Sequence, residues 1–331
     1  MEKICAIAKK WGLKPEYIRE IKSNVWEIDV NEGRYALKAS ALKEDKLRFI
    51  AAAQKHLDNC GFQGFARPIL YKGSPYFLQE GRCYTLYDWV EGDKCDFDNI
   101  SHLSAAAKTL GEFHLYSRRE ELVMSDNAKA GYWLWPEKLA KRIRDMERFQ
   151  ALAAADHSDF FSKMYLGFSP PFLAKAWEAR RMLLTSSYQR IAAEDYKVGA
   201  FIHYDVAARN FIIQKDRAYL IDFDYCSLDL PVVDLMRLIK RSLKYGGNSR
   251  EKITAIVDSY SAVRPLSKEQ WQVLYALLLF PQKFWRLAVR YFDNQTDWEK
   301  DTFDKKIKAV VRELENEDTW LPILRQKVGL E

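Results

Sequence analysis

One segment of the chain carries three polar side chains at a fixed spacing: His203-Tyr204-Asp205-Val206-Ala207-Ala208-Arg209-Asn210, or H-x-D-x-x-x-x-N. The chain has only five histidines, so this match is rare by chance. Twelve residues after Asn210, the apolar residues Leu220-Ile221 lead into the carboxylate of Asp222. A polar turn between two strands would explain the first segment but not the carboxylate that follows the next strand. The two matches together indicate a catalytic site.

The segment brings together the residue types that phosphoryl transfer needs. Asp205 would accept, or orient through, the hydroxyl of an acceptor while a γ-phosphoryl group departs. Asn210 and Asp222 offer the hard oxygen ligands that Mg²⁺ prefers. His203 enters the catalytic set as a residue that fixes the loop by hydrogen bonding rather than one that transfers a proton. We therefore predict Asp205 and His203 as catalytic residues and Asn210 and Asp222 as magnesium-binding residues.

A lysine far upstream fits the same chemistry. Arg34-Tyr35-Ala36-Leu37-Lys38 predicts a strand ending in Lys38, which could neutralise the α- and β-phosphates of ATP. A strand lysine alone is more often a solvated edge charge, but its order with the downstream motif favours a nucleotide site. Ala36 leaves room for an adenine, and Tyr87–Val90 stands where a hinge would offer backbone groups to the base. The predicted nucleotide-binding residues are Ser23, Asn24, Ala36, Lys38, Tyr87, Asp88, Trp89, Val90 and Ile221.

The expected elements divide the chain near residue 90. Before it we expect a helix at Glu2–Trp11, a helix at Lys43–Asn59, and strands at Tyr17–Ser23, Val25–Val30, Arg34–Ala39, Arg67–Lys72, Tyr76–Glu80 and Cys83–Val90. After it, apolar periodicity predicts helices at Asn99–Arg118, Pro136–Leu152, Pro171–Ile191, Leu230–Leu243, Glu251–Tyr260 and Lys268–Tyr291. Two strands, Gly199–Ile213 and Ala218–Asp224, interrupt these helices and carry the catalytic residues. The pattern predicts an α+β, bilobal fold with a small sheet-rich lobe and a large helical lobe.

Composition narrows the class of protein. The 331 residues are 48% hydrophobic, 14% aromatic and 30% charged, which describes a globular protein and excludes disorder. The apolar runs are far shorter than the roughly 20 residues that span a bilayer, and no signal-peptide core follows Met1, so neither a membrane nor secretion is expected. Five cysteines without CxxC spacing indicate reduced thiols in a cytoplasm. The net charge of +6 is spread along the chain, so nucleic acid is not expected as a partner.

The chain resembles the kinase-like fold of aminoglycoside phosphotransferases and choline kinases, and within that group the spore-coat CotS-type proteins of endospore-forming bacteria. The resemblance covers nearly the whole chain. It is carried by Tyr35–Lys38, Tyr87–Gly92, Leu110–His114, His203–Asn210, Ile221–Cys226 and Phe280–Trp285.

This resemblance implies a bilobal protein-kinase-like fold and an ATP-dependent small-molecule kinase. Residues 1–90 would form the nucleotide-binding lobe that ends in the hinge, and residues 91–331 the lobe with the catalytic loop and acceptor site. Asp205 would be the base, Asn210 and Asp222 would hold magnesium, and Lys38 would bind phosphate. Asp234 would have a structural role at a helix start, and Asp224 would be either a second metal ligand or a substrate contact.

Two departures from the family pattern bear on activity. The turn Ser23-Asn24-Val25 contains no glycine where protein kinases place a glycine-rich phosphate loop, so we expect it to close less tightly. The helix segment Phe49–Gln54 lacks the glutamate that usually pairs with the strand lysine, so we expect Lys38 to be unpaired and loosely positioned. Two alternatives stay open: a catalytically weak, pseudokinase-like structural component of the spore coat, and a metabolic kinase for homoserine, choline or a sugar.

The expected partners are a nucleotide, with Mg²⁺, and a small hydroxylated acceptor. The resemblance adds other spore-coat proteins, with deposition on the coat from the mother-cell cytoplasm. The acceptor pocket is expected among the helices after residue 91, where periodicity reports packing and not specificity. Lys283 and Arg286 could bind an anionic acceptor and Trp285 could stack on a ligand, but a solvated helix face and core packing explain these residues more simply.

Overall fold

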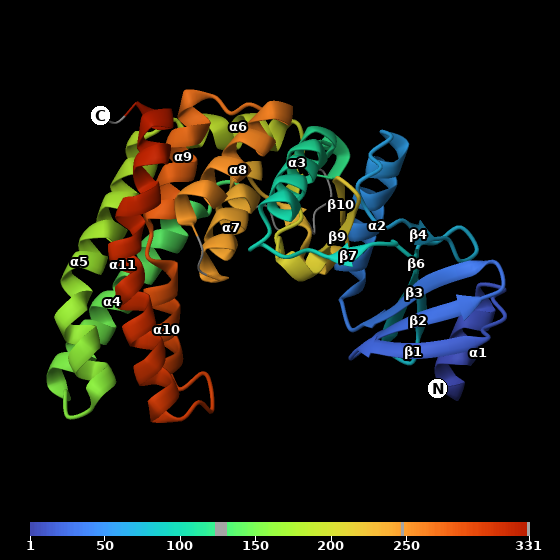
Figure 1. Cartoon of the computed structure of the whole chain (residues 1–331), viewed down its shortest axis with the longest axis horizontal. Coiled ribbons are helices and arrows are strands. Elements are labelled where there is room, and N and C mark those ends of the chain that lie inside the picture. Colours follow the sequence, from blue (N-terminus) through green and yellow to red (C-terminus); the bar gives the residue numbers. More distant parts are fainter. Residues whose placement is uncertain (123–130, 246–247, 330–331) are drawn as a thin grey trace.

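The computed structural model describes residues 1–122, 131–245 and 248–329. It has two parts, an antiparallel sheet with two helices and a larger helical body, which lie at opposite ends of the molecule (Figure 1). This arrangement confirms the expected α+β, bilobal fold with a sheet-rich N-terminal lobe and a helical C-terminal lobe. In the residues so described, no helix has both the length and the apolar character that crossing a membrane requires.

The N-terminal lobe is built on one sheet. Its elements are the helices α1 (Glu2–Lys10) and α2 (Glu44–Asn59) and the strands β1 (Tyr17–Lys22), β2 (Val25–Val30), β3 (Gly33–Ser40), β4 (Pro68–Ile69), β5 (Phe77–Gln79) and β6 (Arg82–Asp88). The strands pair in the order β1-β2-β3-β6-β4, all antiparallel, and β5 pairs with β6. The predicted strand Arg67–Lys72 is thus much shorter than expected, at two residues.

Alternation along β3 decides which residues face the site. Leu37 and Ala39 are buried in a small core with Ile4 and Ile7 of α1. Successive side chains of a strand point to opposite faces, so Lys38 points away from this core, toward α2 and the helical lobe. The burial of apolar side chains on one face of β3 therefore fixes where Lys38 lies.

In the C-terminal lobe, helices surround a three-stranded sheet and a two-stranded sheet. Its strands are β7 (Asp93–Lys94), β8 (Phe201–Ile202), β9 (Phe211–Gln214), β10 (Arg217–Leu220) and β11 (Ser227–Leu228), with β9 between β7 and β10 and β8 paired to β11. Its helices are α3 (Ile100–Tyr116), α4 (Trp135–Ala155), α5 (Phe160–Thr185), α6 (Tyr188–Lys197), α7 (Pro231–Ser242), α8 (Ser249–Val263), α9 (Lys268–Leu279), α10 (Gln282–Phe292) and α11 (Lys300–Val328). Phe113 of α3 packs edge-on against Phe201 and Phe223, so the core reaches both segments that carry the catalytic residues.

The helix predicted at Pro171–Ile191 was wrong at both ends. The structure has α5 from Phe160 and a separate α6 from Tyr188. Asp159 caps α5, because its carboxylate accepts the N–H of Ser162 at 2.9 Å. Pro171 was read as a helix start, but this cap and the buried residues of the preceding turns place the start eleven residues earlier.

The helix predicted at Lys268–Tyr291 is two helices, α9 and α10, that meet at Pro281. Proline cannot donate an N–H to the preceding turn, so carbonyl oxygens at the break need other partners. The ammonium of Lys240 supplies them, at 3.2 Å from the carbonyl of Leu277 and 2.7 Å from that of Phe280. The sequence reasoning also missed α11, which lies beside α10 at the end of the molecule farthest from the sheet (Figure 1).

Candidate active site

The catalytic loop is anchored by one buried carboxylate. Asp234, in the first turn of α7, accepts the backbone N–H groups of His203 and Tyr204 at 2.7 and 2.8 Å. The side chain of His114 on α3 lies 3.3 Å from the same carboxylate and donates to it. Tyr204 has a positive φ of 68°, a conformation that costs free energy for any residue except glycine. Asp234 therefore holds the loop in a strained shape that places Asp205.

His203 ties the catalytic loop to the segment that carries Asp222. Its imidazole is fully buried, and Nε2 donates a hydrogen bond to the carbonyl of Ile221 at 3.0 Å. Burial lowers the pKa of His203, which keeps the ring neutral. A neutral, fully buried ring whose N–H bonds a backbone carbonyl acts as a brace and has no path to an acceptor in solvent.

Asp205 is held by three nitrogen donors. Arg241 of α7 donates to Oδ1 at 2.6 Å, while Arg209 and Asn210 donate to Oδ2 at 2.7 and 2.8 Å. Burial alone would raise the pKa of Asp205, but Arg241 and Arg209 outweigh burial and hold this pKa below its ordinary value. The carboxylate is therefore ionised at neutral pH and can accept a hydrogen bond from a hydroxyl group.

Asn210 and Asp222 offer oxygen atoms of the kind that could hold Mg²⁺. The amide nitrogen of Asn210 is used, because it donates to Asp205, but its Oδ1 is buried and has no hydrogen-bond partner in the described part of the chain. The N–H of Ile221 donates to the carbonyl of Asn210 at 3.0 Å, which brings the two segments together. Asp222 adds a carboxylate in the left-handed region, at φ 69°. An orphaned amide oxygen and a carboxylate on two joined segments match the hard oxygen donors that Mg²⁺ takes.

The expectation that Lys38 is unpaired was wrong. Its Nζ lies 2.5 Å from Oδ1 of Asp222 and 2.7 Å from Oδ1 of Asp224. Burial would lower the pKa of Lys38, but the two carboxylates outweigh burial and raise it. A kinase glutamate on the helix would supply one negative charge here; in this chain Asp224 supplies it from the segment after β10. This contact places Asp224 beside Lys38, a pairing that the sequence reasoning did not predict.

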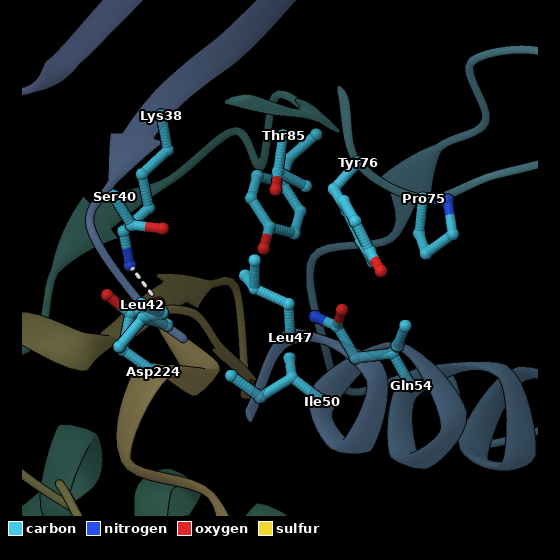
Figure 2. A pocket seen from close by; sticks show the side chains of 12 residues that line it. Lys38, Ser40, Leu42, Leu47, Ile50, Gln54, Pro75, Tyr76, Thr85 and Asp224 are labelled. Atoms are coloured by element: carbon cyan, nitrogen blue, oxygen red, sulfur yellow. Dashed lines mark ion pairs between the residues drawn. The ribbon is translucent and has the colours of Figure 1, made fainter. Parts of the chain in front are cut away.

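Helix α2 presents glutamine where a glutamate was looked for. A pocket behind Lys38 is lined by Gln54 together with Thr85, Tyr76 and Asp224, and Figure 2 shows these side chains around it with the Lys38–Asp224 ion pair at one side. Gln54 is buried, and its Nε2 has no hydrogen-bond partner in the part of the chain that the structure covers. Gln54 carries no charge that could pair with the ammonium of Lys38, whose ion pairs are with the two aspartates.

The turn Ser23-Asn24 is held to its neighbours by hydrogen bonds. Asn24 takes the positive φ itself, at 67°, a conformation that asparagine tolerates better than most residues. Its carbonyl accepts the N–H of Ala39 at 2.9 Å, and Arg82 donates to its side chain at 2.8 Å. The turn is thereby tied to β3 and β6.

The predicted hinge is partly engaged by the sheet. The N–H of Asp88 donates to the carbonyl of Arg67 at 3.1 Å, and the N–H of Trp89 donates to the carbonyl of Arg34 at 3.3 Å. These two N–H groups are therefore committed to the protein. A base at this edge would depend on the carbonyl groups and on Val90. Ala36 pairs with Tyr87 across the same edge, and burial raises the pKa of Tyr87 to about 12.

Sequence reasoning missed two cations of the site. Lys22, at the end of β1, places its Nζ 3.4 Å from Oδ2 of Asp222. Arg241 reaches Asp205 from α7, 36 residues away. Neither residue stands in a motif, and only the spacing Arg237–Arg241 on one face of an amphipathic helix could have signalled a cationic surface.

The chain is similar to known proteins in both sequence and structure. The family model described as "Spore coat putative kinase YutH" matches residues 5–323. Spore coat protein S of Bacillus subtilis (strain 168) is 24% identical over 318 residues, covering 93% of this chain and 91% of that protein. An aminoglycoside phosphotransferase structure from Alicyclobacillus acidocaldarius has a TM-score of 0.87 at 23% identity, covering 98% of this chain and 96% of that one. A spectinomycin phosphotransferase solved with ADP and spectinomycin has a TM-score of 0.58 at 16% identity, covering 94% and 97%.

The structural likenesses establish the kinase-like fold, and the family model spans both the strand with Lys38 and the catalytic loop. The chain belongs to the YutH family of spore-coat kinase-like proteins.

Proposed function

We propose that this protein is an ATP- and Mg²⁺-dependent phosphotransferase that acts on a hydroxyl group of a small molecule. One observation carries the proposal: Lys38, from the N-terminal sheet, is joined by a series of direct contacts to Asp222, Asn210 and Asp205 of the helical lobe. Lys38 pairs with Asp222, the residue before Asp222 bonds Asn210, and Asn210 bonds Asp205. Such a chain of contacts aligns a phosphate-binding cation, a metal site and a hydroxyl-orienting carboxylate.

Each residue of the site has its own role in the proposed phosphoryl transfer. Lys38 and Lys22 bind phosphate oxygens. Asn210 and Asp222 would hold magnesium, which would supply positive charge against the phosphates. The ionised Asp205 accepts a hydrogen bond from the acceptor hydroxyl and orients its oxygen toward the γ-phosphorus. As that oxygen bonds the phosphorus, the bond to the ADP oxygen breaks, and the hydroxyl proton passes to Asp205. Positioning and electrostatics supply most of the rate in such a reaction.

Two related proteins support the nucleotide and the place of action. The spectinomycin phosphotransferase with this fold was solved with ADP, which supports ATP as the donor here. The relative named spore coat protein S supports deposition of this protein on the spore coat from the mother-cell cytoplasm, with other coat proteins as partners. We assign residues 1–90 to the nucleotide-binding lobe, with the hinge at its end, and residues 91–331 to the lobe that binds the acceptor.

A second candidate is a catalytically weak structural component of the coat. It is favoured by Arg209 and Arg241, which together engage both oxygens of Asp205, and by Gln54 in place of a glutamate. In that case the site would bind nucleotide poorly or not at all, and the fold would serve assembly.

Titration calorimetry with ATP, with and without Mg²⁺, separates the two candidates. We expect magnesium-dependent binding to the wild-type protein and its loss in Asp222→Ala. Asp205→Asn should bind Mg-ATP with nearly wild-type affinity and transfer no phosphate in an acceptor screen. Absence of ATP binding under every condition would overturn the phosphotransferase proposal, and wild-type turnover by Asp205→Asn would remove Asp205 from the mechanism.

A further inference from the structure

Four arginines from three helices converge beside the catalytic loop: Arg142 of α4, Arg237 and Arg241 of α7, and Arg286 of α10. We call them the arginine cluster. Arg241 contacts Asp205 at 2.6 Å, and the guanidinium of Arg237 lies 3.5 Å from the centre of the Tyr204 ring. These two arginines are four residues apart on α7 and so share one face of the helix.

The other two arginines meet where α4 and α10 pack together. Arg142 donates to the side chain of Gln282 at 2.6 Å, and its guanidinium lies 4.8 Å from the Trp285 ring. Arg286 stands one turn after Gln282 on the same helix face. Burial first, and then the positive charges of Arg237, Arg290 and Arg241, lower the pKa of Arg286. Arg286 of α10 is therefore influenced by the positive charge of both α7 arginines.

Negative charge around the arginine cluster is scarce. In residues 1–122, 131–245 and 248–329, no carboxylate forms an ion pair with Arg142, Arg237 or Arg286, and Nε of Arg237 is buried without a hydrogen-bond partner. Burial also lowers the pKa of Arg142, to about 10. Arg142 and Arg237 are half-buried without a carboxylate counter-charge, which costs free energy that a purely structural role would not require.

The nearest carboxylates are engaged elsewhere. Asp145 accepts the indole N–H of Trp285 at 3.0 Å, and Asp205 is shared with Arg209 and Asn210. Asp229 is buried, accepts the indole N–H of Trp135 at 3.1 Å, and has a pKa that burial raises to about 6. Lys138 adds another cation near Arg142 and Arg237. The balance of charge beside the acceptor hydroxyl's position is therefore positive.

We infer that the acceptor of this phosphotransferase is a small hydroxyl compound that also carries an anionic group, a phosphate or a carboxylate, bound by the arginine cluster. Guanidinium groups bind both kinds of anion through paired N–H donors. Tyr204, under Arg237, is adjacent to Asp205, so the anionic group lies within a few bonds of the hydroxyl that receives the phosphoryl group. A cationic acceptor such as choline would be repelled. This inference rests on the proposed function.

Inorganic sulfate tests the cluster without any need for turnover. The probe is titrated into the wild-type protein by calorimetry at constant ionic strength, with saturating Mg-ADP to fill the phosphate sites of the nucleotide. We expect one bound sulfate, with affinity reduced about tenfold or more in Arg237→Gln and Arg286→Gln. Arg144→Gln is the matched control, because Arg144 is exposed on α4 two residues from Arg142. Arg286 is also exposed, so its variant remains informative if Arg237→Gln folds poorly.

Displacement of sulfate then identifies the anion. Glycerol 3-phosphate and glycerate distinguish a phosphate from a carboxylate, while glycerol and choline should displace nothing. No sulfate binding by the wild-type protein, or equal affinity in all variants, would overturn the inference. If ATP and ADP fail to bind but sulfate still binds in an Arg286-dependent way, the phosphotransferase proposal fails and the anion site stands. If Mg-ATP binds while sulfate does not, the anion site fails and the phosphotransferase proposal stands.

Discussion

Replacing Asp224 with asparagine removes one of the two carboxylates that hold Lys38. The Lys38 side chain is 15% exposed and that of Asp224 is 27% exposed, so this pair is intermediate between surface and buried. Exposed pairs contribute about 0–1 kcal/mol, and breaking a buried pair costs about 3–5 kcal/mol. In the Mg-ATP complex Asp222 would bind the metal, which leaves Asp224 to position Lys38 on the phosphates. We expect a loss of about 1–2 kcal/mol, or roughly 5–30-fold weaker binding of Mg-ATP.

Titration calorimetry of Asp224→Asn with Mg-ATP measures this loss directly. Asp216→Asn is the matched control, since Asp216 is an exposed aspartate in the turn between β9 and β10. Unfolding curves of both variants establish that each is folded. Binding by Asp224→Asn at wild-type affinity would refute the reasoning, because Lys38 would then be positioned without its second carboxylate.

A second substitution, in the pocket behind Lys38, should restore Mg-ATP affinity to Asp224→Asn. Gln54 and Lys38 line this pocket from opposite sides (Figure 2), so Gln54→Glu would return a carboxylate to the position that a kinase helix usually supplies. We expect the double variant with Asp224→Asn to recover most of the lost affinity. Failure of the rescue alone would mean that α2 lies too far from Lys38 in the nucleotide complex.

Three other changes have expected outcomes. Asp234→Asn should lower the free energy of unfolding by about 2–3 kcal/mol in urea titrations, because it weakens the acceptor of the strained Tyr204 N–H. Lys22→Gln should change stability little but raise KM for ATP several-fold at low salt, with the gap closing as salt screens the exposed lysine. Burial raises the pKa of Asp229 to about 6 in the folded protein, compared with about 4 in the unfolded chain. Protonated Asp229 therefore contributes stability that is fully present below pH 4 and is lost as the pH rises through 6. Asp229→Asn should therefore flatten the decline of thermal stability between pH 4 and 7, and an unchanged slope would contradict the assignment.

Sequence alone located the residues whose chemistry requires a fixed local spacing. Asp205 and Asn210 are five residues apart on one loop, and Asp222 follows the next strand, so their proximity is a local property of two short strands. The sheet was predictable for a similar reason, because alternation along β3 separates the face that α1 covers from the face that carries Lys38. Local patterns therefore gave both the fold class and the core of the candidate site.

Contacts between distant segments could not be predicted in this way. Asp224 replaces the absent glutamate only because the segment after β10 packs against β3. Arg241 reaches Asp205 only because Asp234, in the first turn of the same helix α7, anchors the catalytic loop. The break at Pro281 also depends on a tertiary contact, since Lys240 satisfies the carbonyl groups left by the proline. In each case the charge was visible in the sequence and its partner was not.

The backbone of the site favours an enzyme over a scaffold. Tyr204 and Asp222 both have positive φ, at 68° and 69°, which costs about 1–2 kcal/mol for a residue with a side chain. Glycine would relieve this strain at either position, but at Asp222 it would also remove the ion pair with Lys38. The buried Oδ1 of Asn210, which has no hydrogen-bond partner among the described residues, lowers the stability of the fold further. These costs fall where a metal and an acceptor hydroxyl would bind, which is the distribution expected when geometry at those points is used for chemistry.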